Sequence, residues 1–177
     1  MIFVMKQQSR RIAVCSMMAA FSVVVMLLGA VLSLGMYVCP MLVGLCLMLI
    51  GREYGVRYHL MLWVVVSILC FMLVPNPEEN MIFAGLFGWY PAARPTLERL
   101  PKRLRKAVKL LLFNLVVIAL EALLLFIIAP EILDAAMVLL LLLMGNVVFI
   151  MYDNIIPKFP DLAGKYLKRS FFHSGSK

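Results

Sequence analysis

The sequence has few charged residues and still fewer acidic ones. Only 15% of the 177 residues are charged, with 9 Asp and Glu against 17 Lys and Arg, whereas 64% are hydrophobic. A soluble domain of this length cannot bury so much apolar surface, so the composition predicts an all-α integral membrane protein. We expect one membrane domain over residues 1–177.

Sequence motifs for catalysis and metal binding are also lacking. The chain has no G-x-x-x-x-G-K-[ST], H-E-x-x-H or G-x-S-x-G, so we expect neither a P-loop ATPase nor an enzyme. The four cysteines have no paired CxxC spacing and no nearby histidine, which argues against a zinc site. We therefore expect no catalytic residue, no metal and no cofactor.

The hydrophobic runs predict six transmembrane helices. Their expected ranges are about 12–34, 37–50, 60–74, 77–93, 107–129 and 131–156, followed by a basic cytoplasmic tail over 157–177. A polar loop over 51–59 is expected after the second helix. The fourth helix contains Gly85 and Gly88 and meets Pro91, so it is the easiest span to break, and broken membrane helices often line cavities.

The basic residues predict the orientation of these helices. All 17 Lys and Arg fall in the N-terminus, the 51–59 loop, the segment before the fifth helix and the tail, which share one side of a six-helix arrangement. The other side holds only acidic charge, including Glu78 and Glu79. Because Lys and Arg favour the cytoplasmic side, we expect N-in/C-in topology in the plasma membrane. Their alternation with lipid-facing spans argues against a nucleic-acid partner.

Polar residues within the fifth and sixth helices are candidate sites. Asn114 and Glu121 are seven residues apart and project from one face of the fifth helix. Asn114 and Asn146 have similar depths on antiparallel helices, roughly 10–15 Å from the cytoplasmic end, so we expect them to hydrogen-bond to each other. Glu121 has no such partner at its depth. It either joins two helices as a buried carboxyl or contacts a ligand.

The segment 75–80 predicts a helix start. Asn76 is expected as the N-cap, Pro77 as the first helical residue and Glu79 as the third, as in a capping box. The helix dipole then accounts for the acidic pair, and contact with a substrate is the alternative.

Small residues predict a close helix contact on the first helix. Ala13, Ser16 and Ala20 lie on one face, and Cys15 and Ala19 on another. Small residues four apart let helix backbones approach closely.

With this helix pattern and the stretch RIAVCSMMAA at residues 11–20, the chain resembles the substrate-binding S component of energy-coupling-factor (ECF) transporters. In that family an Ala-x-x-x-Ala face on the first helix docks on a transmembrane coupling subunit, and Ser16 with Ala20 and Cys15 with Ala19 match it here. The resemblance implies a micronutrient cavity near the outer face and two ATPase subunits as partners. The outward polar groups available to a small-molecule substrate would be Glu121, Asn80, Asn76 and Tyr37.

A non-transport scaffold that resembles the rod-shape protein MreD is the alternative. The connection between the first two helices is very short, and the outer half has few polar groups, both of which depart from the S-component pattern. A scaffold would use the basic, amphipathic segment 94–109 and its helix faces for protein contacts.

Overall fold

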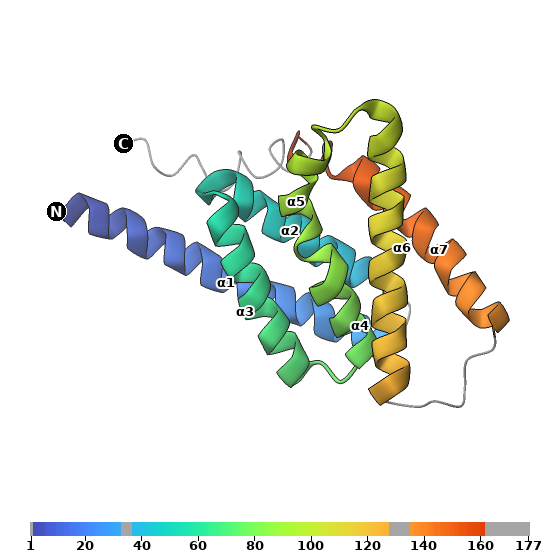
Figure 1. The fold of residues 1–177 in the computed structure, drawn as a ribbon. Helices are drawn as coiled ribbons and strands as arrows, with labels where there is room; N and C mark the ends of the chain where they lie inside the picture. The colour runs from blue at the N-terminus through green and yellow to red at the C-terminus, as the bar shows by residue number, and fades with distance from the viewer. Residues whose placement is uncertain (1, 33–36, 128–134, 162–177) are drawn as a thin grey trace.

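The computed structural model describes residues 2–32, 37–127 and 135–161, which form helices and contain no strand. The elements are α1 (Ile2–Leu32), α2 (Val38–Tyr54), α3 (Val56–Leu73), α4 (Pro77–Ile82), the π-helix η1 (Phe83–Phe87), α5 (Tyr90–Leu97), α6 (Lys102–Ile127) and α7 (Ala135–Ile155). Figure 1 shows them as one bundle in which α4, η1 and α5 follow one another as a broken rod.

Two apolar clusters hold the bundle together. The first joins α1, α2 and α3, with Met26, Leu47 and Val66 fully buried between these helices. The second joins α2 and the broken rod to α6 and α7, and there Phe113 stacks on Phe149 with ring centroids 4.6 Å apart. The broken rod therefore lies between the two halves of the fold.

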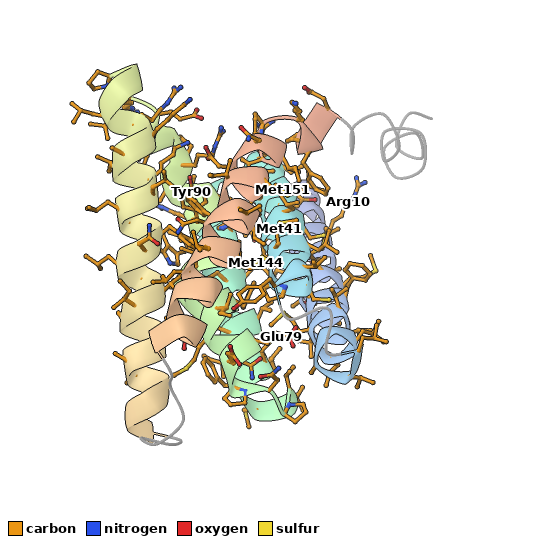
Figure 2. The ribbon with its side chains drawn as sticks, turned by 90° about the vertical axis from the view of Figure 1, so that its right-hand side faces the viewer. Arg10, Met41, Glu79, Tyr90, Met144 and Met151 are labelled. Carbon is orange, nitrogen blue, oxygen red and sulfur yellow. The ribbon has the colours of Figure 1, made fainter. Side chains whose placement is uncertain are left out.

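The two ends of the bundle carry opposite charge. The α2–α3 turn, the α5–α6 connection and the end of α7 lie at one end, and the α3–α4 connection lies at the other (Figure 1). We call the first the basic end, because among the described residues it carries Arg10, Arg11, Arg52, Arg57, Arg94, Arg99, Arg105, Lys106, Lys109 and Lys158. We call the second the acidic end, and its acidic residues within the described ranges are Glu78, Glu79 and Glu121. In Figure 2, Arg10 and Tyr90 lie toward the basic end and Glu79 lies toward the acidic end.

The outside of the bundle is apolar. Val31 is 76% exposed, Met72 78% and Leu111 68%, and they belong to α1, α3 and α6. Within the described residues, two helical segments, Gln8–Leu32 and Val56–Leu73, are long and apolar enough to cross a membrane. Soluble monomers rarely expose so much contiguous apolar surface, whereas lipid-facing helices do.

The polar loop expected over 51–59 is wrong. Instead, α2 continues to Tyr54 and α3 begins at Val56, so a single residue separates them. Gly55 makes this reversal with φ 103°, a backbone conformation that other residues rarely adopt. The expected ranges 37–50 and 60–74 are too short for this reason.

Other expected boundaries also shift where polar residues continue a helix. The helix expected at 12–34 begins at Ile2, and the one expected at 107–129 begins at Lys102, because Lys, Arg and Gln are good helix formers beyond the apolar part. The helix expected at 77–93 is broken at η1 and continues to Leu97. The expected starts and ends within 33–36, 128–134 and 162–177 lie outside the described residues.

Candidate functional site

The centre of the bundle is the broken rod, and several of its backbone carbonyls accept hydrogen bonds from side chains. In η1 the backbone N–H of Gly88 donates to Phe83 O at 2.8 Å, the wide turn of a π-helix. Trp63 of α3 donates its indole N–H to Ala84 O at 3.1 Å. Trp89 donates its indole N–H to Gly85 O at 2.7 Å.

Two more carbonyls of this rod have side-chain donors. The hydroxyl of Tyr152 in α7 donates to Phe87 O at 3.0 Å, and His59 Nε2 donates to Gly88 O at 2.8 Å. His59 is buried and packs between the helices. These bonds satisfy the groups that a break in a helix leaves unpaired, so the break is part of the packed structure.

A small recess opens between the broken rod, α6 and α7 toward the acidic end. Tyr37 and Glu121 both line it, together with apolar walls that include Phe87 and Phe113. Its volume is about 20 Å³, which is room for one water molecule and no organic ligand. Two of the four residues expected at a substrate site are thus brought together, in a recess that is too small for a substrate in this arrangement.

The other two expected residues, Asn76 and Asn80, do not line the recess. Asn76 is the N-cap of α4, and its side-chain oxygen accepts from the backbone N–H of Glu78 at 3.2 Å and of Glu79 at 3.5 Å. Asn80 is buried and donates to Cys70 O at 3.2 Å and Val74 O at 3.0 Å. Asn80 therefore ties α4 to the end of α3.

The sequence pattern does not predict the burial of Glu79 that the structure shows. Glu79 is the third residue of α4, as expected, but its carboxyl makes no capping-box bond and points into the bundle, where it is 0% exposed. Neither carboxyl oxygen has a hydrogen-bond partner. An acidic residue at this position is already explained by the helix-capping pattern. Nothing in the neighbouring sequence indicates whether the Glu79 carboxyl is buried or solvated.

A cluster of charges joins α5, α6 and α7 near the basic end. Asp153 accepts hydrogen bonds from the Tyr90 hydroxyl at 2.8 Å, from Arg94 Nε at 2.9 Å and from Lys109 Nζ at 2.8 Å. Arg94 also pairs with Glu98 at 2.6 Å. The sequence gives no sign of this cluster, because the partners of Asp153 lie 44 to 63 residues away along the chain.

The predicted pair Asn114 and Asn146 is in direct contact. Asn114 Nδ2 donates to Asn146 Oδ1 at 3.2 Å, and Asn146 Nδ2 donates to Asn114 Oδ1 at 2.9 Å. Each amide also donates to the backbone one turn earlier in its own helix, to Leu110 O and Leu142 O. The pair is therefore a satisfied link between α6 and α7.

The small residues of α1 face an open groove. Ser16, Ala19 and Ala20 lie on its α1 side, and α3 supplies the other wall, with Tyr58 and Met61 among its residues. The groove has a volume of about 440 Å³ and an almost wholly apolar lining. Ala13 is exposed on the same helix but outside the groove.

The described residues contain no group of three or more His, Cys, Asp and Glu placed to hold a metal ion. In comparisons with protein-family models, with curated proteins and with solved structures, the chain matches none significantly.

Proposed function

We propose that this chain is the substrate-binding membrane subunit of an ATP-driven, ECF-type micronutrient importer. It crosses the plasma membrane six times with both termini in the cytoplasm, so the basic end faces inward and the acidic end outward. The apolar exterior and the opposite charges of the two ends support this orientation.

The observation that carries the proposal is the groove between α1 and α3. Its α1 wall includes two residues with small side chains at one-turn spacing, Ser16 and Ala20, and both are exposed. Such spacing lets a second helix approach closely enough for its backbone to pack against α1. We assign the groove to a transmembrane helix of a coupling subunit, which would transmit the work of two ATPase subunits.

The substrate site in this proposal is the recess at Tyr37 and Glu121. Because the recess holds about one water, a substrate enters only when α6 and α7 separate from the broken rod. The closed recess is the ligand-free arrangement in this account. Glu121 would then contact a cationic or hydroxylated group of the ligand.

Thermal stabilisation of the purified protein by a panel of vitamins and other micronutrients tests the substrate-binding role. A ligand that stabilises the wild type should bind Glu121→Gln at least about tenfold more weakly, or 1.4 kcal/mol. Glu53→Gln, an exposed residue at the basic end, is the matched control and should bind normally. Unchanged affinity in Glu121→Gln would remove Glu121 from the site.

The small volume of the recess favours one alternative, a membrane scaffold that resembles MreD. A scaffold needs no ligand cavity and would use the groove and the basic end for protein contacts. No stabilisation by any panel member, together with co-purification of cell-wall or division proteins, would favour the scaffold.

A further inference from the structure

The proposed function does not explain why the carboxyl group of Glu79 is buried. Its side chain is fully buried, and neither carboxyl oxygen has a hydrogen-bond partner. Among the described residues, no Lys, Arg or His pairs with it. The side-chain oxygen of its neighbour Asn80 is also buried without a partner. Buried hydrogen-bond acceptors thus outnumber hydrogen-bond donors around Glu79.

Within the part of the chain that the structure describes, no cation forms an ion pair with Glu79. It lies against Gly29 of α1, and within electrostatic reach of two thiols, Cys39 on α2 and Cys70 on α3. On its own helix, Glu78 interacts electrostatically with Glu121 instead. Burial without a partner disfavours the charged form of a carboxyl strongly, because it loses its hydration and gains no compensating contact.

The packing around the carboxyl restricts what could neutralise it. A Cβ added to Gly29 would collide with Glu79 Oε1 and would lie only 2.8 Å from Cys39 Cβ and 2.9 Å from its Sγ. On this side there is no room even for a methyl group. A proton occupies no extra volume, removes the charge and turns one carboxyl oxygen into a donor.

We propose that the carboxyl of Glu79 is a proton-binding site that holds α4 against α1 and α2 at the acidic end of the bundle. With the proton bound, the neutral carboxyl packs beside Gly29. When the proton leaves, the charged group requires water or a cation, and α4 separates from α1. This site is distinct from the recess at Glu121 and does not depend on the transport proposal.

Infrared spectroscopy of the purified protein in lipid nanodiscs tests the site directly. At neutral pH the wild type should show the C=O stretch of a protonated carboxyl, and the band should be lost in Glu79→Gln. Glu78→Gln is the matched control from the same helical turn and should retain the band. Absence of the band from the wild type, or its persistence in folded Glu79→Gln, would overturn the proposal.

Stability measurements supply a second test. Because the folded protein holds a proton that the unfolded chain releases, the thermal stability of the wild type should fall as pH rises, relative to Glu79→Gln. Parallel pH profiles would contradict the proposal, and so would stabilisation of the wild type by Na⁺ at constant pH, which would indicate a metal cation instead. If Glu79→Gln does not fold, Glu79→Asp replaces it. The shorter acid should shift the frequency of the band, and an unshifted band would exclude Glu79.

Discussion

The ammonium group of Lys109 lies 2.8 Å from each carboxyl oxygen of Asp153. The Lys109 side chain is only 6% exposed. This contact joins α6 to α7 at the end of the bundle where the two helices also meet α5. Removal of Asp153 alone leaves the buried ammonium of Lys109 without its nearest anion. Removal of both residues leaves only Arg94 of this contact, which still pairs with Glu98. The pair therefore affects the stability of the fold, and the loss of stability in a single variant should differ from that in the double variant.

Asp153→Asn should destabilise the protein by about 3 kcal/mol, measured by reversible unfolding in detergent. Lys109→Met combined with Asp153→Leu should recover part of this loss, since the Lys109 charge is then gone and Arg94 keeps its ion pair with Glu98. Glu98→Gln is the control, because its oxygen lies 3.9 Å from Lys109 and its side chain is more exposed, so its cost should be below about 1 kcal/mol. A double variant as unstable as Asp153→Asn would contradict this account.

The polar link between α6 and α7 should be weak. Asn114→Ala and Asn146→Ala, with the double variant, form a cycle whose coupling energy we expect at about 0.6 kcal/mol and at most about 2. The value stays small because each amide keeps its bond to the backbone of its own helix. A coupling energy of zero would show that the two side chains do not interact in the membrane.

These contacts show which features of the fold follow from sequence. The depths of Asn114 and Asn146 follow from the helix rise and the chain direction, so their proximity is predictable. The π-helix at 83–87 is not predictable from the sequence, because it depends on hydrogen-bond donors such as Trp63 and Tyr152 that only the folded bundle brings to it. The burial of Glu79 is hidden for the same reason: its neighbours come from three other helices.

The proposed topology predicts opposite accessibility for the two ends. In a background without the four native cysteines, Pro75→Cys should react with a membrane-impermeant reagent from outside the cell. Arg99→Cys should react only after the membrane is opened. Both positions are exposed in the structure, so failure to react reflects the side of the membrane rather than burial. Reaction of both from the same face would reject the six-helix topology.

The groove on α1 predicts a matched pair of variants. Ser16→Leu with Ala20→Leu fills the groove with side chains that would separate a docked helix from α1. Because both residues are exposed, the isolated chain should still fold. Ala119→Leu with Ala122→Leu adds the same bulk to exposed positions on α6 and should leave a docked partner in place.

ATP hydrolysis by the complex captured on the tagged chain from its native membranes tests the central claim most directly. We predict that wild-type chain and the α6 double variant bring down a transmembrane coupling subunit and two ATPase subunits that hydrolyse Mg²⁺-ATP. The α1 double variant should fold but capture at most about a tenth of that activity, which corresponds to a loss of at least 1.4 kcal/mol in binding. Capture of no ATPase by the wild type, or equal activity in all three, would contradict the proposal that this chain serves an ATP-driven importer through the α1 groove.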